Sequence, residues 1–376
     1  MKANKPAHII GSISRTILAL TFIFSGFVKA IDPLGTVYKI EDYLKAFGGW
    51  WTDLLPYAGA AAVCLIALEF VLGVCMLLNV RTKWTSWIAL LFYLVMTPLT
   101  LYIALKNPVS DCGCFGDALV LTNWQTFAKN VVLISLVFVL LGCKKYIPQT
   151  FSWWAELIIA LFGLGVAGGL MGYSYTHLPM MDFRPYKVGN NIPELMIQPE
   201  PDSIQVVHIM EKDGITRTVT NEEYSSAVKE GWKWISQETT YLKRKGEHFV
   251  PMTSSDAPIH DFEIDNIYEG DITDIVLESE EPVALVIVYD LNKTDRKQLD
   301  KLASIIHERS KVYFLTGSTE DEIAAFAEEL GWDEETAFST FCITDPVTLK
   351  TIVRANPGLI VVQNGNIIEK HNFKQL

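Results

Sequence analysis

Basic residues are scarce in this sequence. Its 376 residues include 31 Lys and Arg against 43 Asp and Glu, and the formal net charge is −12. Binding to nucleic acid requires a basic face, so we expect no nucleic-acid partner. Most of the acidic residues follow Met181, whereas the part up to about Gly172 consists largely of continuous apolar runs.

Closely spaced cysteines and histidines are also scarce. The chain has six cysteines, and its one close pair is Cys112-Gly113-Cys114. A zinc site usually takes about four ligands, and no second close pair accompanies this one, so we assign no metal ligands. A small-x-small cleavage site is lacking after the first apolar run, and further apolar runs follow. This favours a retained membrane span over a signal peptide.

Five segments meet the length of about 20 apolar residues that a bilayer-spanning helix needs. They are Ile9–Ile31, Leu54–Val80, Trp84–Leu105, Trp124–Gly142 and Trp153–Met171. Because Arg15 lies inside the first segment, that helix can start either at Ile9 or after Arg15. Tryptophans cluster at the expected helix ends, as in an interfacial aromatic belt.

Lysines and arginines in the short loops predict the orientation, since cytoplasmic loops carry an excess of them. With five spans, one side carries Lys2, Lys5, Arg15, Arg81, Lys83, Lys144 and Lys145. The other side has fewer basic residues, diluted by acidic ones. We therefore expect a multi-pass protein of the bacterial inner membrane with a cytoplasmic N-terminus. The Cys112/Cys114 loop and the C-terminal domain would lie in the periplasm.

The connection between the first two spans, residues 32–53, is longer than a simple loop. Its apolar residues have rough helical spacing; they are Tyr38, Ile40, Tyr43, Leu44 and Phe47. Two interpretations stay open: a helix lying in the outer membrane interface, or a packed cap over the bundle.

After the fifth span the sequence is that of a soluble protein. Prolines mark a linker, and Ser203–Met210 with Ile215–Val219 predicts a hairpin, followed by a short helix after Thr220. From Ala257 the pattern alternates. Strands are predicted at Val283–Tyr289, Lys311–Leu315, Phe341–Thr344, Gly358–Val362 and Asn366–His371, and helices at Asp295–Arg309, Glu320–Leu330 and Thr348–Arg354. This alternation, ending in an Asn364-Gly365 hairpin turn, predicts a small α/β layer domain.

The run Asp111-Cys112-Gly113-Cys114-Phe115-Gly116-Asp117 carries the strongest chemical signal. Two thiols one residue apart can close into a strained disulfide, and strained, exposed disulfides are the labile and catalytic kind. Two other interpretations stay open: a static staple of the loop, or a metal pair completed from elsewhere. Among the remaining cysteines, Cys64 and Cys75 lie in the second span. Cys143 lies on the opposite side of the membrane, and Cys342 lies in a predicted core strand.

Glu69 is the second signal, because an ionisable group near the middle of a span is costly unless it is paired or protonated. Lys29 is a candidate partner. A depth estimate at about 1.5 Å per residue, however, places Lys29 about two turns further out. The alternative is a protonated Glu69 that is hydrogen-bonded to Thr97, Thr100 or Tyr93 for packing alone.

The first four spans resemble the DoxX-like membrane family and, within it, the methylamine-utilisation MauE branch. The residues that carry the resemblance are Arg15, Phe22, Ser25-Gly26, Lys29-Ala30, Asp32-Pro33, Lys39, Glu69, Gly73 and Cys112-Gly113-Cys114-Phe115-Gly116. The resemblance implies a four-helix membrane bundle that takes part in assembling a disulfide-rich periplasmic enzyme. It also implies Cys112 and Cys114 as the redox pair, with Glu69 and Lys29 as matching polar positions. The fifth span and the outer domain depart from the family.

Residues 257–373 resemble a thioredoxin-like fold, since Asn356-Pro357-Gly358 stands where that fold carries a cis-proline. The family's Cys-x-x-Cys should follow the strand Val283–Tyr289. The chain instead reads Asp290-Leu291-Asn292-Lys293. A thioredoxin-like domain here would therefore bind or present a protein substrate, or guard the loop.

Together these features predict an α-helical membrane bundle followed by an α/β thioredoxin-like extracytoplasmic domain. The expected units are a DoxX/MauE-like bundle (9–145), a fifth span (152–172), a linker with a small α+β subdomain (173–256) and the thioredoxin-like domain (257–376). The leading hypothesis is a membrane thiol–disulfide oxidoreductase that acts on an extracytoplasmic thiol protein. Cys112, Cys114, Glu69 and Lys29 would be its functional residues. A quinone near Glu69 is the candidate electron acceptor by location only. The alternative is a non-enzymatic accessory or assembly factor whose outer domain binds a partner protein.

Overall fold

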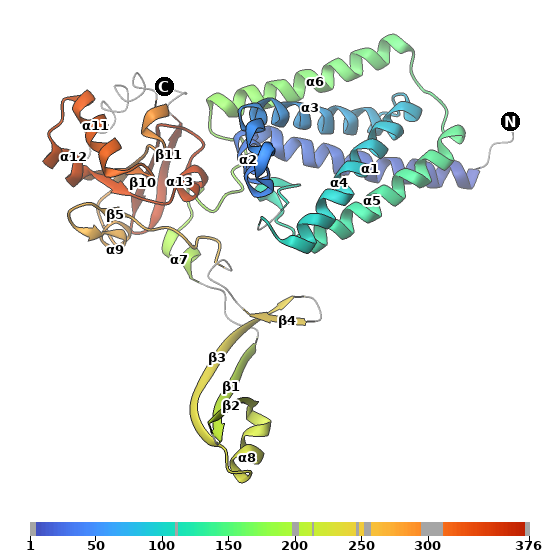
Figure 1. Ribbon diagram of the computed structural model, residues 1–376. Helices are drawn as coiled ribbons and strands as arrows, with labels where there is room; N and C mark the ends of the chain where they lie inside the picture. The colour runs from blue at the N-terminus through green and yellow to red at the C-terminus, as the bar shows by residue number, and fades with distance from the viewer. Residues whose placement is uncertain are drawn as a thin grey trace.

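The N-terminal part of the protein is a bundle of long apolar helices (Figure 1). The computed structural model describes residues 5–109, 112–197, 203–212, 214–245, 248–251, 257–294 and 311–372. The long helices are α1 (Lys5–Ile31), α3 (Ala58–Leu77), α4 (Thr82–Lys106), α5 (Asn123–Cys143) and α6 (Trp153–Thr176). Five segments built on these helices are long and apolar enough to cross a membrane, which confirms the five predicted spans.

The first helix begins before its charged residue. α1 starts at Lys5, so the alternative start after Arg15 is wrong. The Arg15 guanidinium donates hydrogen bonds to the backbone carbonyls of Met76 and Leu77, the latter at 2.9 Å. The last carbonyls of a helix lack partners within the helix. The end of α3 therefore offers acceptors that accommodate an arginine inside α1.

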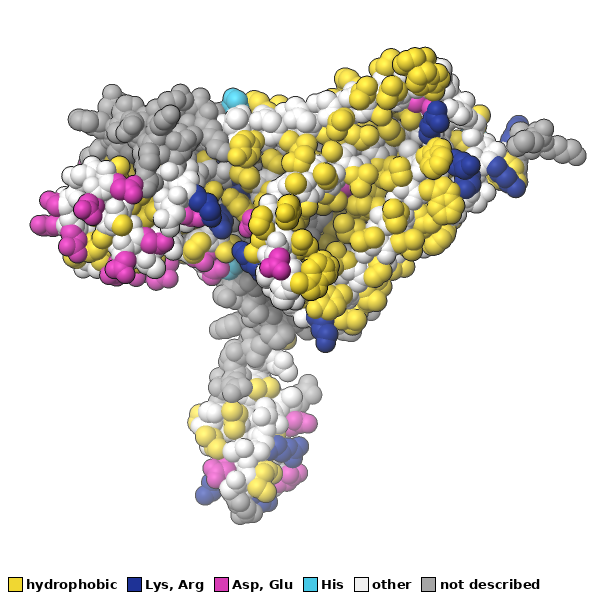
Figure 2. All heavy atoms as spheres, turned by 45° about the horizontal axis from the view of Figure 1, so that its top comes forward, with side chains coloured by type: hydrophobic (Ala, Val, Ile, Leu, Met, Phe, Trp, Pro, Cys, Tyr) yellow, Lys and Arg dark blue, Asp and Glu magenta, His cyan; other side chains and the backbone are white. Residues whose placement is uncertain are grey.

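The surface of the bundle is apolar. Hydrophobic side chains spread over its visible face, whereas Asp and Glu gather on the C-terminal domain (Figure 2). Leu91, Leu161 and Phe162 are 66%, 56% and 68% exposed. Soluble proteins rarely expose contiguous apolar surface of this extent, and it fits the hydrocarbon core of a bilayer. The chain is therefore a multi-pass membrane protein.

Two glycines allow α1 and α3 to pack closely. A Cβ atom at Gly26 would lie 2.6 Å from the backbone nitrogen of Phe70, and one at Gly73 would lie 2.6 Å from that of Ile23. Small residues at helix crossings let backbones approach each other within membranes. The crossing therefore brings the outer part of α1 against the middle of α3.

Residues 33–57 form α2 (Pro33–Phe47) and the 3-10 helix η1 (Gly49–Tyr57). The Asp32 carboxylate caps α2 by accepting the Gly35 N–H at 3.0 Å. α2 packs against α3, and its Tyr38 hydroxyl lies 3.3 Å from the Tyr289 hydroxyl of the C-terminal domain. The predicted helical spacing is confirmed, and α2 caps the bundle. Its position in the membrane interface stays a prediction.

A small antiparallel sheet projects away from the rest of the chain (Figure 1). Its strand order is β2-β1-β3-β4. The strands are β1 (Ser203–Lys212), β2 (Ile215–Thr220), β3 (Lys233–Lys245) and β4 (His248–Pro251). The helix α8 (Asn221–Lys229) follows β2 and begins with a capping box between Thr220 and Glu223. The predicted hairpin and short helix are confirmed.

The C-terminal domain is built on a seven-stranded sheet of order β11-β10-β7-β8-β9-β5-β6. Its strands are β5 (Asp265–Asn266), β6 (Gly270–Asp271), β7 (Val283–Ile287), β8 (Lys311–Thr316), β9 (Phe341–Ile343), β10 (Gly358–Gln363) and β11 (Asn366–Asn372). β7, β8 and β9 are parallel, and β10 is antiparallel to both of its neighbours. Asn364 and Gly365 both have positive φ, as the predicted hairpin turn requires.

Both faces of this sheet are buried, because successive side chains of a strand point to opposite faces. On β7, Val283, Leu285 and Ile287 pack with α9 (Thr273–Leu277), α13 (Pro346–Ile352) and the short helix α7 (Ile192–Met196). Ala284 and Val286 pack with α11 (Glu320–Leu330) and α12 (Glu334–Thr340). The predicted α/β domain is therefore confirmed.

Some expectations extend beyond these observations. The predicted helix Asp295–Arg309 and the loop residue Asp111 lie outside the described residues. The Asn356–Pro357 peptide bond is cis. The thioredoxin-like assignment and the extracytoplasmic placement stay predictions.

Substitution of Gly26 by Ala tests the close crossing of α1 and α3. The added methyl would meet the backbone of Phe70, so the helices must separate. We expect destabilisation of about 1–3 kcal/mol, typical of overpacking, measured as a lower Tm of the detergent-solubilised protein. Gly165→Ala in α6 is the matched control, because a Cβ there meets no atom within 4 Å. Equal Tm values for the two variants would contradict the crossing.

Candidate functional site

The cysteine loop, residues 112–118, connects α4 to α5 and ends in the 3-10 helix η2 (Gly116–Ala118). Gly113 has φ +63°, and a Cβ there would lie 2.8 Å from Cγ of Lys39, so glycine is needed between the two cysteines. Hydrogen bonds fix the backbone on both sides. The Tyr43 hydroxyl donates to the Cys112 carbonyl and the Ser25 hydroxyl to the Cys114 carbonyl, each at 2.7 Å.

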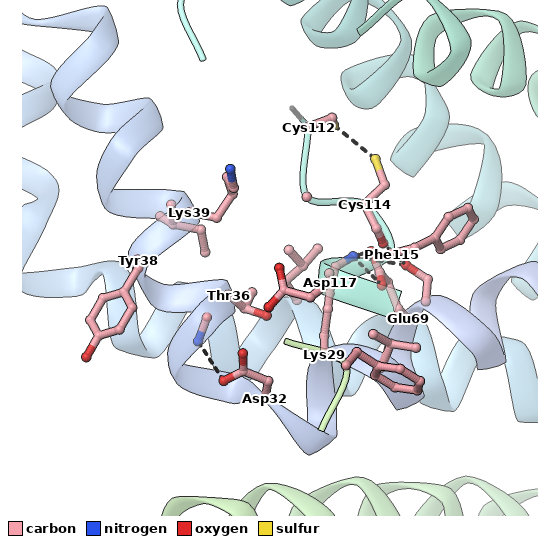
Figure 3. A pocket seen from close by; sticks show the side chains of 18 of the residues that line it. Lys29, Asp32, Thr36, Tyr38, Lys39, Glu69, Cys112, Cys114, Phe115 and Asp117 are labelled. Atoms are coloured by element: carbon pink, nitrogen blue, oxygen red, sulfur yellow. Dashed lines mark hydrogen bonds and ion pairs between the residues drawn. The ribbon is translucent and has the colours of Figure 1, made fainter. Parts of the chain in front are cut away.

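The two thiols of the loop face each other. Their Sγ atoms lie 2.9 Å apart (Figure 3), and both cysteines are free thiols. A disulfide bond is about 2.05 Å long, so a small movement of the loop would close the bond. The pair is therefore placed for two-electron oxidation to a disulfide.

The surroundings give the two thiols different pKa values. A hydrogen bond from Cys112 and the positive charges of Lys129 and Lys29 lower the pKa of Cys114 to about 6, against the opposing effects of burial and Glu69. The same hydrogen bond, together with burial, raises the pKa of Cys112. A hydrogen bond to a thiolate favours the charged form. Cys114 is therefore the more acidic of the two thiols, and Cys112 is its proton-bearing partner.

Lys29 and Glu69 form a buried ion pair below this loop. The Lys29 ammonium lies 2.7 and 2.8 Å from the two Glu69 carboxylate oxygens and 3.0 Å from the Ser25 hydroxyl. The depth estimate that separated them by two turns is wrong. The alternative in which Glu69 is hydrogen-bonded to Thr97, Thr100 or Tyr93 is wrong too, because its carboxylate oxygens accept from Lys29. α1 ends at Ile31, and the chain then turns into α2, which packs on α3. The outer end of α1 therefore lies level with the middle of α3.

A cavity of about 420 Å³ joins these groups. One wall is the cysteine loop, and another is α2. The Lys29–Glu69 pair lies in the interior, as Figure 3 shows. Lys350 and Arg354 of the C-terminal domain also line it. The C-terminal domain thus forms part of the wall of the cavity that contains the dithiol.

A charged contact holds the C-terminal domain in this place. The Arg354 guanidinium donates to the Asp32 carboxylate at 3.0–3.2 Å and lies 3.7 Å from that of Asp117. Burial raises the pKa of Asp32, but Arg354 and Arg184 outweigh this effect and hold it below its usual range. Arg354 also stacks over the Tyr38 ring at 5.3 Å. Charge-assisted bonds of this kind are among the stronger hydrogen bonds.

Sequence reasoning missed two charged residues of the site. Lys129 lines the cavity and lies 4.2 Å from the centre of the Phe115 ring. It falls inside the predicted fourth span, so the rule that singled out Glu69 could have found it. Arg354 carried no such signal, because its partner Asp32 lies 322 residues away.

The other cysteines are set apart from the pair. Cys342 is fully buried in β9, where burial raises its pKa to about 12, so it is a core residue as predicted. Cys75 is buried in α3, and Cys64 is exposed on the same helix. In the described part of the chain, no group of three or more His, Cys, Asp or Glu side chains is arranged to hold a metal ion.

The membrane domain is similar to a known family. Residues 7–143 match the family model described as Methylamine utilisation protein MauE, a range of little more than a third of the 376 residues. The match takes in the helices α1 to α5 and the cysteine loop, and it confirms the MauE resemblance of the membrane domain. No curated protein and no solved structure matches the chain. The wider DoxX-like and the thioredoxin-like resemblances stay predictions.

Replacement of Lys129 by Gln tests its action on Cys114. Loss of the positive charge should raise the pKa of Cys114 from about 6, by roughly one unit for a nearby opposite charge. Because the thiolate reacts and the thiol does not, the pH midpoint of alkylation by iodoacetamide should move upward by that amount. The Lys129 variants and their reference protein all carry Cys112→Ser, so that Cys114 is the thiol of the pair that is alkylated. Lys129→Arg keeps the charge and should leave the midpoint in place; an unmoved midpoint in Lys129→Gln would contradict the assignment.

Replacement of Arg354 by Ala tests whether the C-terminal domain shields the cavity. Without the guanidinium, Asp32 loses its partner and docking of the C-terminal domain weakens. Labelling of the loop cysteines by a bulky maleimide should accelerate roughly tenfold for every 1.4 kcal/mol lost from docking. Lys311→Ala is the control, because Lys311 is exposed at the start of β8 in the C-terminal domain. Equal labelling rates for the two variants would exclude this shielding.

Proposed function

We propose that this protein catalyses thiol–disulfide exchange at the membrane surface and thereby matures extracytoplasmic proteins. The observation that carries the proposal is the 2.9 Å approach of the Cys112 and Cys114 Sγ atoms in a cavity that the C-terminal domain also lines. The match of the membrane domain to the methylamine-utilisation MauE family supports it. The orientation of the loop toward the periplasm, an oxidising compartment, is part of the proposal.

The exchange begins with the pair in its disulfide form. A thiolate of the substrate protein attacks Cys112 Sγ, and the Cys112–Cys114 bond breaks. Cys114 leaves as the thiolate, because a thiol of lower pKa is the better leaving group. A second substrate thiolate then attacks the substrate sulfur of the mixed disulfide and releases Cys112. The substrate gains one disulfide and loses two electrons and two protons. One proton goes to Cys112 and the other to solvent, so the pair ends as the Cys112 thiol and the Cys114 thiolate.

The buried ion pair has a positioning role in this scheme. Lys29 binds both Glu69 and the Ser25 hydroxyl, and Ser25 in turn donates to the carbonyl of Cys114. The ion pair is therefore linked through a single hydroxyl to the backbone of the reactive cysteine. The C-terminal domain would present the substrate, because its residues also line the cavity.

A synthetic dithiol peptide tests the proposal with the purified, oxidised full-length protein. We expect the peptide to lose two hydrogens as its disulfide forms, and mass spectrometry measures this loss. The double variant Cys112→Ser/Cys114→Ser should abolish it. In Cys114→Ser, the remaining Cys112 should retain the peptide as a mixed disulfide when the peptide is supplied in oxidised form. Cys64→Ser is the matched control, because that cysteine lies in α3 outside the cavity lining.

The accessory-factor hypothesis predicts the opposite result. Suppose that cells with the double serine variant still mature the extracytoplasmic substrate protein, while removal of residues 257–376 abolishes this maturation. The thiols are then a structural staple. Partner binding by the C-terminal domain would then be the function.

A further inference from the structure

Continued exchange, which is the function proposed above, requires an oxidant that regenerates the Cys112–Cys114 disulfide. Among the described residues, the remaining cysteines offer no second dithiol to pass the electrons to. Cys342 is fully buried in its β-strand, and the cavity lining contains no cysteine besides Cys112 and Cys114. The electrons must therefore leave through a separate molecule that reaches the cavity.

The cavity continues from the cysteine loop into the membrane bundle. We call this part the inner arm; it is lined by Phe22, Leu65, Phe92, Tyr93, Met96 and Leu99 from α1, α3 and α4. Three of these rings form a cluster, with centroids 5.2 to 5.5 Å apart. Aromatic and thioether side chains favour the faces and edges of a flat ring. The walls thus suit a planar, apolar ligand.

Polar groups stand at defined points of the inner arm. Tyr93 is only 3% exposed and lines the cavity, and its hydroxyl makes no hydrogen bond to a described residue. A tyrosine hydroxyl that lines a cavity can donate a hydrogen bond to an acceptor on a ligand. The Lys29 ammonium already donates to Ser25 and to both Glu69 carboxylate oxygens, so it lines the cavity as a charge and not as a further hydrogen-bond donor.

The inner arm also lies close to lipid. Met96 and Phe92 are half-buried, whereas their neighbours Leu94 and Val95 on α4 are 51% and 60% exposed on the apolar surface. The lining thus passes from the core of the bundle to its lipid-facing side. A molecule dissolved in the bilayer can reach the arm without passing through water.

We infer that the inner arm binds a lipid-soluble quinone, which reoxidises the Cys112–Cys114 dithiol. One of its ring carbonyl oxygens would accept a hydrogen bond from the Tyr93 hydroxyl. In the redox step the Cys112 thiol loses its proton, Cys114 reacts as the thiolate, and the sulfur–sulfur bond forms. The quinone gains two electrons, takes up the Cys112 proton and one proton from solvent, and leaves as the hydroquinone. Sites for small organic molecules commonly measure about 300–1,000 Å³, and the whole cavity falls in this range at about 420 Å³.

Reduced full-length protein mixed with a fully ring-substituted benzoquinone tests this inference. Full substitution disfavours covalent addition of the quinone to thiols. We expect one Cys112–Cys114 disulfide for each hydroquinone, measured by differential alkylation and by the ultraviolet absorbance of the quinone. Loss of a hydrogen bond in Tyr93→Phe should raise the quinone concentration for half-maximal rate roughly fivefold. Tyr102→Phe, a 43% exposed tyrosine on the same helix, should leave it unchanged.

A second pair of variants tests where the quinone binds. Met96→Trp fills the inner arm and should slow quinone reduction strongly, while Leu94→Trp places the same bulk toward lipid and should not. The dithiol-peptide exchange described above serves as the folding control, because it does not use the arm. Equal quinone rates in the two tryptophan variants would overturn the inference.

The two proposals fail in distinguishable ways. If peptide exchange proceeds but the quinone leaves the wild-type dithiol reduced, the inference about the oxidant is wrong and the exchange function stands. If peptide exchange itself is absent, the exchange function is wrong, whatever the quinone does.

Discussion

The buried ion pair between Lys29 and Glu69 is the interaction on which the site depends. Neither charge is tolerable alone in the hydrocarbon region, so the two side chains must meet. They can meet only because Gly26 and Gly73 let the backbones of α1 and α3 approach. The same ammonium orients Ser25, which holds the carbonyl of Cys114. The close packing of α1 and α3 thereby helps to fix the position of the cysteine loop.

Local patterns predicted much of the fold. The five spans, the hairpin at Asn364-Gly365 and the alternation of strands and helices follow from hydrophobic runs and turn residues close together in the sequence. The depth of Lys29 relative to Glu69 did not follow. The estimate measured each helix along its own axis and assumed that all helices end at one plane. α2 breaks that assumption, because it packs beside α3 above the end of α1.

Contacts between distant parts of the chain could not be predicted. Asp32 was marked by the family resemblance as part of the helix pattern, yet its carboxylate also binds Arg354 of the C-terminal domain. Nothing near Arg354 in the sequence indicates this partner. Lys129 is different, since a lysine within an apolar span is visible from the sequence alone. Single residues of the site were predictable from the sequence, but the assembly of the site from two domains was not.

The C-terminal domain meets the membrane domain near the end of β7. The predicted thioredoxin-like fold would place reactive cysteines after this strand, beside the cis-proline. Here Tyr289 and Asp290 follow β7, and Asn356 binds the Asp290 carbonyl at 2.7 Å. Tyr289 and the neighbouring Arg354 contact α2 and Asp32 of the membrane domain. The edge that would carry the thiols therefore packs against the membrane domain, which has its own pair. Under the proposed exchange function, a second dithiol at that edge would compete with Cys112 and Cys114 for the same substrate, whereas a dithiol-free edge could bind substrate and leave the electron transfer to the membrane domain.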